Sequence, residues 1–222
     1  MYVRGEGFRL LPTKGNKELS LHNLPMSESL PKIAILVGTK GRGSNMRAIA
    51  EACASGHVAA RVEVVVSPKE GTAAVEAAAE QGLRIEVIPY DDESYPEKLL
   101  KALGDCDLIC LAGYMKLLPK EILEAFPNRI LNIHPALLPK FGGKGMYGRH
   151  VHEAVLAARE AESGVTVHLV SEEYDEGEIV LQLRCQVLPG DTAESLASRV
   201  LELEHMAYPM AISALLGKPP VN

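Results

Sequence analysis

The sequence predicts a single α/β domain in which a mostly parallel, Rossmann-like β-sheet is flanked by helices. Short and almost continuous apolar runs recur along the chain, and such runs are typical of strands that are covered on both faces. Helix-like segments alternate with these runs at the spacing of β-α-β units, which favours parallel strands. The chain has 222 residues, enough for one such domain with its own core.

Five apolar runs in the first two thirds of the chain predict the parallel strands. They are KIAILVG (32–38), VEVVVS (62–67), IEVIPY (85–90), DLICLAG (107–113) and RILNIH (129–134). The segments between them predict helices over 44–56, 73–82, 95–104 and 119–126. The first two of these helices end in glycine, which is a common C-terminal helix signal.

The pattern changes after Pro135. A glycine-rich loop (139–148) precedes a helical segment (150–161), and a long helix is predicted over 191–217 with Asp191 as its N-cap. Residues 164–171 and 178–189 alternate between apolar and polar side chains. This alternation predicts two neighbouring, half-exposed strands at the far end of the sheet.

Residues 1–30 show no periodic apolar face, no apolar signal-peptide core and no cleavage site. We expect them to form a partly disordered N-terminal extension outside the domain. The four cysteines contain no CxxC pair, so buried free thiols and a cytoplasmic location are expected. The net charge of −6 argues against anionic partners, and neither a nucleic-acid nor a membrane partner is expected.

The loop GTKGRGSN (38–45) follows the first strand and opens the first helix. Backbone N–H groups at a helix N-terminus bind anions, so Gly43, Ser44 and Asn45 are candidates for a phosphate site. The loop matches neither G-x-G-x-x-G, because Met46 stands where the third glycine would be, nor a P-loop, because no lysine precedes Ser44. A glycine turn that serves only strand–helix packing is the alternative.

The stretch NIHP (132–135) ends the fifth strand with polar groups. In an extended segment Asn132 and His134 point to the same side, and the following proline favours extended geometry at His134. An amide can donate to an oxyanion and an imidazole can move a proton, so the pair suggests catalysis. Asp175, in the acidic turn EEYDEGE (172–178), is the candidate that would orient the imidazole. A turn-capping histidine and a solvated acidic turn are the alternatives.

Metal catalysis is not expected, because the chain lacks H-E-x-x-H, a two-His-one-carboxylate spacing and a cysteine cluster.

Four motifs in this order resemble a known family. GRGSN (41–45), AGYMKLLP (112–119), NIHPALLP (132–139) and SEEYDEGEIVLQ (171–182) make the chain, from about 31 to 217, similar to the phosphoribosylglycinamide formyltransferases of the folate-dependent formyltransferase superfamily. The resemblance implies a formyltransferase fold over residues 31–222. It also implies transfer of a formyl group from 10-formyltetrahydrofolate to the amine of glycinamide ribonucleotide in purine biosynthesis. Both substrates are small molecules, and no metal or tightly bound cofactor is implied.

The resemblance also implies roles for individual residues. Asn132, His134 and Asp175 match the catalytic set, and Gly43, Ser44, Asn45 and Glu204 match the ribonucleotide site. The implied folate site comprises Met115, Lys116, Leu117, Leu118, Asn132, Ser171, Glu172, Glu173, Tyr174 and Asp175.

The chain departs from the family pattern at several places. The glycine loop carries two extra residues near Lys40, and the loop 141–148 is enlarged. Lys116 and Leu201 stand where an arginine and a glutamine occur in some members, and the segment 90–98 has no arginine near the folate tail.

Two alternatives remain open: a deformylase-like hydrolase, and a nucleotide-binding regulatory module without catalysis. A monomer or a homodimer is expected.

Overall fold

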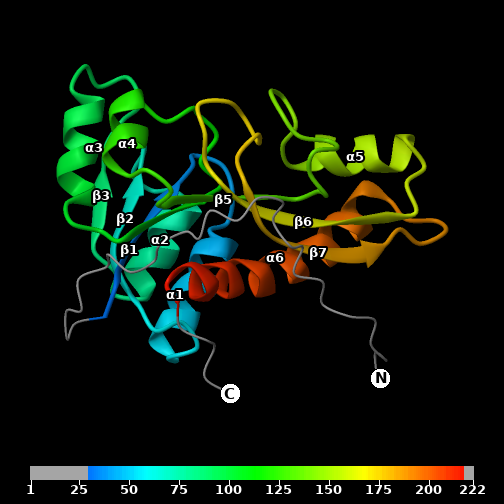
Figure 1. Ribbon diagram of the computed structural model, residues 1–222, viewed down its shortest axis with the longest axis horizontal. Coiled ribbons are helices and arrows are strands. Elements are labelled where there is room, and N and C mark those ends of the chain that lie inside the picture. The colour runs from blue at the N-terminus through cyan, green and yellow to red at the C-terminus, as the bar shows by residue number, and fades with distance from the viewer. Residues whose placement is uncertain (1–29, 218–222) are drawn as a thin grey trace.

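A seven-stranded sheet organises the molecule (Figure 1). The computed structural model describes residues 30–217, and the predicted N-terminal extension therefore lies almost wholly outside the described residues. The strands are β1 (Lys32–Val37), β2 (Arg61–Ser67), β3 (Ile85–Val87), β4 (Leu108–Ala112), β5 (Ile130–His134), β6 (Glu162–Leu169) and β7 (Ile179–Gln186). The helices are α1 (Ser44–Ala54), α2 (Ala73–Glu80), α3 (Tyr95–Leu103), α4 (Lys120–Ala125), α5 (Arg149–Ala157) and α6 (Ala193–Leu215).

The strand order is β3-β2-β1-β4-β5-β6-β7. The first five strands are parallel, and β6 and β7 join the sheet as antiparallel neighbours. After β1 the chain moves outward through β2 and β3, and then returns to β4 on the other side of β1. The carboxyl ends of β1 and β4 therefore lie side by side at a switch point, where open α/β sheets bind their ligands. The predicted fold class is confirmed.

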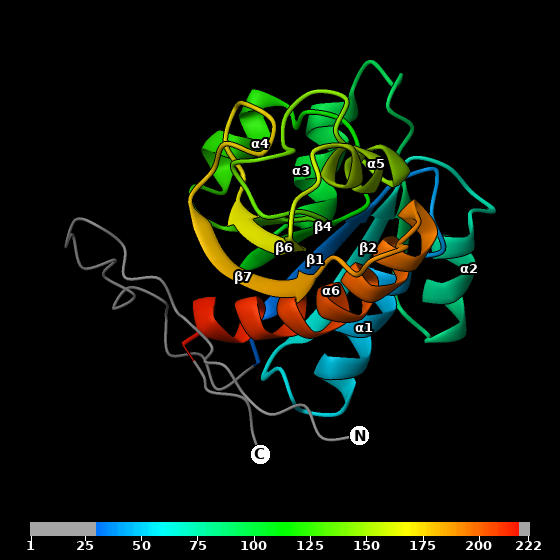
Figure 2. The same ribbon diagram turned by 90° about the vertical axis from the view of Figure 1, so that its right-hand side faces the viewer.

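Helices cover both faces of the parallel part of the sheet, with α1 and α6 on one side and α3 and α4 on the other (Figure 2). In β1, Ile33 and Ile35 pack with the first group, whereas Ala34 and Leu36 pack with the second. All four are fully buried, which explains why the strand reads as a continuous apolar run. All four cysteines are free thiols; Cys106 and Cys110 are buried, as expected, whereas Cys53 and Cys185 are only partly buried.

The prediction that β6 is half exposed was wrong. Seven of its eight residues are buried, because α6 packs on one face and the segment after β5 covers the other. The polar residue Thr166 made the strand look half exposed in the sequence, but it is buried. Its hydroxyl donates to the Ala136 carbonyl at 2.6 Å and accepts from the Leu138 N–H at 3.0 Å. A polar residue with such partners can be buried at little cost.

The N-cap of α6 is Thr192, whose hydroxyl accepts from the Ser195 N–H at 3.2 Å, and the prediction of Asp191 was wrong by one residue. Asp191 forms an ion pair with Arg199 instead, at 2.8 Å.

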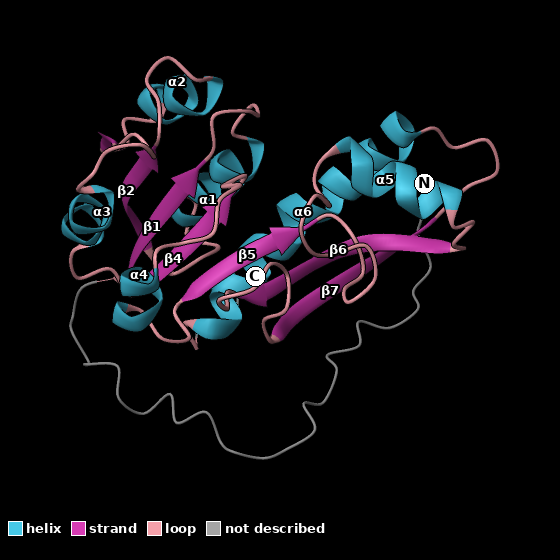
Figure 3. Ribbon diagram, turned by 90° about the horizontal axis from the view of Figure 1, so that it is seen from above, coloured by secondary structure: helices cyan, strands magenta, loops and turns pink. Residues whose placement is uncertain are grey.

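Helix α6 is tied to the middle of the sheet. The buried Tyr208 hydroxyl lies 2.9 Å from the Leu111 carbonyl of β4 and 3.1 Å from the Leu131 carbonyl of β5. The helix also packs against α5 (Figure 3). These contacts hold one face of α6 beside the carboxyl ends of the central strands. No helix within residues 30–217 has the length and apolarity needed to cross a membrane.

Candidate active site

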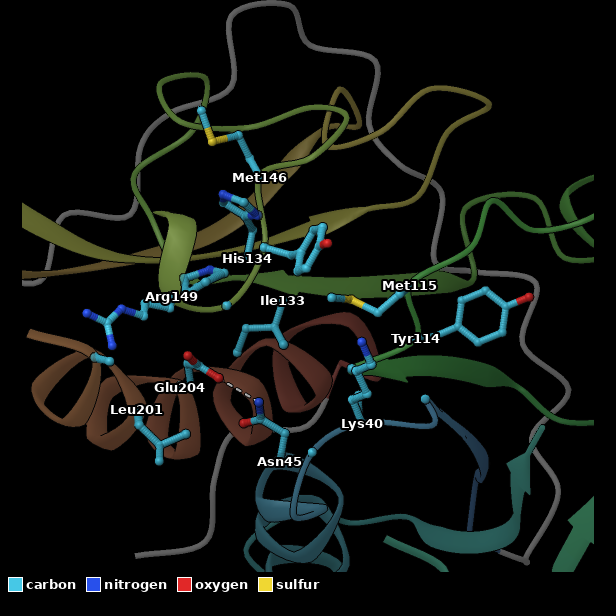
Figure 4. Close-up of a pocket in the computed structure, with 18 of the residues that line it drawn as sticks. Lys40, Asn45, Tyr114, Met115, Ile133, His134, Met146, Arg149, Leu201 and Glu204 are labelled. Atoms are coloured by element: carbon cyan, nitrogen blue, oxygen red, sulfur yellow. Dashed lines mark hydrogen bonds between the residues drawn. The ribbon is translucent and has the colours of Figure 1, made fainter. Parts of the chain in front are cut away.

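A cavity of about 930 Å³ opens at the switch point (Figure 4). Gly38 after β1 and Gly113 after β4 meet at its floor, and a Cβ on Gly38 would lie only 2.1 Å from the Gly113 carbonyl oxygen. The walls come from segments far apart in the sequence: the glycine loop and the start of α1, the ends of β4 and β5, the loop 143–148, the start of α5, the turn at Asp175, and one face of α6.

The glycine loop presents a helix N-terminus to the cavity. Gly43 is the N-cap of α1 with φ of 71°, and the first backbone N–H bonded back to it is that of Arg47. The N–H groups of the first turn, which include those of Ser44 and Asn45, therefore have no partner within the helix. Lys40 and Arg42 also line the cavity. This end of the cavity suits an anion.

Asn45 and Glu204 connect α1 with α6 at the same end. The Asn45 Nδ2 donates to Glu204 Oε2 at 2.6 Å (Figure 4). Burial raises the pKa of Glu204, and the hydrogen bond from Asn45 opposes that rise only in part. The Asn45 Oδ1 is buried and has no partner among the described residues. A ligand that offers hydroxyl groups can donate to the Glu204 carboxylate, which lines the cavity.

At the other end of the cavity, Asp175 is surrounded by His134, Asn132 and His168. Its Oδ2 accepts from the Gly143 N–H at 2.9 Å and lies 3.5 Å from His134 Nδ1. Its Oδ1 lies 3.4 Å from Asn132 Nδ2 and 3.6 Å from His168 Nε2. Burial acts to raise the pKa of Asp175, but His168, His134 and the Gly143 N–H outweigh it, and the pKa lies below its usual value. Asp175 is therefore an ionised carboxylate at neutral pH.

Hydrogen bonds to backbone carbonyls fix the protons of the two imidazoles. His134 Nε2 is 2.8 Å from the Phe141 carbonyl, which can only accept, so Nε2 carries a hydrogen and Nδ1 faces Asp175. His168 Nδ1 donates in the same way to the Leu169 carbonyl at 2.9 Å. His168 Nε2 then accepts from Asn132 Nδ2 at 3.1 Å.

The pKa of His134 lies below its usual value. Burial is the main cause, and it exceeds the opposing effects of the Asp175 carboxylate and the Phe141 carbonyl. Asp175 thus acts to raise the His134 pKa, but burial sets the direction of the net shift. In the neutral ring the lone pair of Nδ1 points toward the carboxylate, so His134 is placed to take a proton at that atom.

The acidic turn that carries Asp175 can approach the sheet only because of a glycine. A Cβ on Gly177 would lie 1.6 Å from the Leu169 carbonyl and 3.4 Å from His168 Nδ1. Asp175 itself adopts the left-handed conformation, with φ of 58°. The turn is therefore packed against β6 at Gly177, while its glutamates, Glu172, Glu173, Glu176 and Glu178, are exposed.

The cavity brings together most, but not all, of the residues predicted from the sequence. Asn132, His134, Asp175, Gly43, Ser44, Asn45, Glu204, Met115 and Tyr174 line it, whereas Lys116, Leu117, Leu118, Ser171, Glu172 and Glu173 do not. Leu118 is buried in the core on the α3 and α4 side. The Lys116 ammonium lies over the Tyr90 ring, 4.6 Å from its centroid.

Sequence reasoning missed two histidines. His168 was not assigned to the site, yet it is the cross-strand partner of Asn132. The pairing of His168 with Asn132 depends on the antiparallel register of β5 and β6, which cannot be read from the sequence. His152, buried on α5, was also missed as a cavity residue. Within residues 30–217, no group of His, Cys, Asp and Glu side chains is arranged to hold a metal ion.

Comparisons with known proteins agree with this geometry. The formyl transferase family matches residues 31–212. A chloroplastic phosphoribosylglycinamide formyltransferase of Arabidopsis thaliana is 44% identical over 191 residues, which is 83% of this chain and 65% of that protein. The chain thus spans slightly less than two thirds of the plant relative.

A phosphoribosylglycinamide formyltransferase of Haemophilus influenzae is 37% identical over 82% of this chain and 86% of its own length. The crystal structure of glycinamide ribonucleotide transformylase 1 from Symbiobacterium toebii superimposes with a TM-score of 0.77 at 37% identity, covering 88% of this chain and 92% of that one. Sequence and fold therefore agree, and the chain belongs to the formyl transferase family.

Proposed function

We propose that this protein transfers the formyl group of 10-formyltetrahydrofolate to the amine of glycinamide ribonucleotide, giving formylglycinamide ribonucleotide in de novo purine biosynthesis. One observation carries the proposal. A single cavity has a helix N-terminus suited to a phosphate at one end and Asn132, His134 and Asp175 at the other. The two ends suit the two parts of a ribonucleotide that carries a reactive amine.

In this proposal, the ribonucleotide lies along α6. Its phosphate meets the first turn of α1 at Gly43, Ser44 and Asn45, and its ribose hydroxyls meet Glu204. The folate lies toward Met115 and Tyr174, on the wall formed by the end of β4 and the acidic turn. The formyl carbon is then next to the Asp175 cluster.

The chemistry follows from the groups at that end. The amine attacks the formyl carbon, and the carbonyl oxygen becomes a tetrahedral oxyanion. The contact from Asn132 Nδ2 to Asp175 is long, at 3.4 Å, so this hydrogen is available to the oxyanion when it forms. One such donor is worth about 3–4 kcal/mol of barrier in comparable sites.

The amine must also lose a proton, and the departing folate nitrogen must gain one. His134 takes the proton at Nδ1, where the resulting imidazolium faces Asp175 at 3.5 Å. The same proton then passes to the folate nitrogen as the carbon–nitrogen bond breaks. His168 keeps Asn132 in place by accepting its other hydrogen.

The test is whether 10-formyltetrahydrofolate is consumed only when glycinamide ribonucleotide is present. Stoichiometric appearance of formylglycinamide ribonucleotide supports the proposal. Consumption without the ribonucleotide, with release of formate, would favour a deformylase. Ribonucleotide binding with no consumption would favour a regulatory module.

A further inference from the structure

His152 is a buried ionisable group on the cavity wall that the proposed chemistry does not use. It lies on α5, its side chain is 4% exposed, and it lines the cavity together with Arg149, one helical turn earlier. Arg149 forms an ion pair with Glu194 of α6, which also lines the cavity, as does Ser198. A buried imidazole in such a place normally has its nitrogens satisfied.

Neither ring nitrogen of His152 has a hydrogen-bond partner among residues 30–217. Nδ1 is sealed from solvent and unpaired. Nε2 is also unpaired but is not sealed, and the ring lines the cavity, so Nε2 is the nitrogen that a ligand can reach. Burying a nitrogen without a hydrogen-bond partner costs less free energy when it is a bare lone pair than when it carries a hydrogen. In the neutral ring, Nδ1 is therefore the lone pair and Nε2 carries the hydrogen.

The position of His152 indicates what it can bind. It is close enough to His134 for the charge of that ring to lower its pKa further, after burial, which is the main cause. His152 is therefore a neutral donor next to the reacting centre. In glycinamide ribonucleotide the amide carbonyl is one methylene away from the reacting amine. An acceptor thus comes close to Nε2 when the amine is at the His134 end.

We propose that His152 Nε2–H binds the glycinamide carbonyl of the ribonucleotide and so distinguishes this substrate from ribose phosphates that lack the glycinamide arm. This assignment rests on the proposed function. It makes His152 a specificity residue that orients the amine and leaves proton transfer to His134.

Three variants test the assignment. His152→Leu removes the donor with an apolar side chain of similar size, and His152→Gln restores an N–H near the position of Nε2. His150→Leu is the matched control, because His150 lies on the same helix with its side chain 64% exposed and off the cavity wall. Binding of glycinamide ribonucleotide and of ribose 5-phosphate is measured by calorimetry for each variant, together with formyl transfer by the unmodified protein.

We expect His152→Leu to weaken glycinamide ribonucleotide binding roughly ten- to a hundredfold and to leave ribose 5-phosphate binding unchanged. His152→Gln should recover most of the loss, and His150→Leu should bind both ligands normally. Equal weakening of both ligands, or no weakening of either, would overturn the assignment. A wild-type protein that fails to formylate the ribonucleotide would refute the proposed function, whereas an active wild type with an unaffected His152→Leu variant would refute this inference alone.

Discussion

Two partly buried carboxylates, at opposite ends of one cavity, have pKa values shifted in opposite directions. Glu204 has one uncharged partner, Asn45, and its pKa is raised by burial. Asp175 is surrounded by two imidazoles, an amide and a backbone N–H, and its pKa is lowered although burial acts against it. Burial works in the same direction on both groups, so the partners decide the sign.

This difference assigns the two carboxylates different roles, one in catalysis and one in substrate binding. A carboxylate that keeps its charge can stabilise an imidazolium that forms during a reaction, and Asp175 is such a group. Glu204, with its single neutral donor, is better suited to accept hydrogen bonds from neutral hydroxyls. The variants below test that contrast, beginning with the largest expected effect.

Asp175→Asn should lower turnover by roughly a hundredfold or more, because it removes the charge that favours protonated His134. The pKa of His134 should fall further, so the acidic limb of the pH–rate profile should move to lower pH. Ribonucleotide binding should stay nearly unchanged. The measurement is a pH–rate profile combined with ribonucleotide titration.

His134→Ala and the double variant with Asp175→Asn should be about equally impaired, because residues that act as a unit are not additive. Near-normal turnover of Asp175→Asn with an unshifted profile would exclude Asp175 as the partner of His134.

Ser44→Asp should affect the anion end alone. A carboxylate in the first turn of α1 repels a phosphate, so the Michaelis constant for the ribonucleotide should rise about tenfold or more. Folate affinity should be little changed, and both are obtained from initial rates over a grid of the two substrates. Ser198→Asp, on the α6 wall of the same cavity, is a comparison for a charge added elsewhere. Equal loss of affinity for both substrates would mean that the glycine loop is structural.

Glu204→Gln should weaken ribonucleotide binding about tenfold, since a neutral amide accepts more weakly than a carboxylate. The same change should raise the melting temperature at pH 7. The folded-state pKa of Glu204 lies above the unfolded value, so its favourable contribution is present below the unfolded pKa and is lost as pH rises through the folded pKa.

Asp175→Asn should change the melting temperature at pH 7 in the opposite direction and lower it. Its folded-state pKa is lowered, so the stability that it contributes is present above the unfolded pKa and is lost as pH falls through the folded pKa. Melting curves of both variants between acidic and neutral pH provide the check. A shift of the same sign in both variants at pH 7 would contradict the contrast between the two carboxylates.

Removal of residues 1–30 should have the smallest effect. Their sequence has no periodic apolar face, so turnover and both Michaelis constants should change by less than about twofold. A truncated protein that loses affinity for one substrate only would show which end of the cavity the segment supports.

The sequence alone was sufficient for the fold class and for five of the seven strand positions within a residue or two. The central strands β1 and β4 are buried on both faces, so their apolar runs are continuous and their boundaries are sharp, whereas the half-buried edge strand β3 was predicted to residue 90 and ends at Val87. Strand β6 differs from the prediction because Thr166 and His168 are buried with hydrogen-bond partners, so a polar residue in this strand does not indicate exposure. The far end of β7 was predicted three residues too long.

The sequence predicted those parts of the candidate site in which one segment supplies the functional groups. It did not predict the contacts between segments that are far apart in the sequence. Asn132 and His134 face one side because a strand alternates, and the first turn of α1 presents its N–H groups because a helix must leave them unpaired; both follow from local geometry. The pairing of Asn132 with His168, the donation from Gly143 to Asp175 and the unpaired nitrogens of His152 depend on the packing of distant segments. Residue types and their order therefore determined which reaction class this chain resembles. Only the tertiary structure decided the charge of each buried group, because that charge depends on the partners that packing brings within about 4 Å.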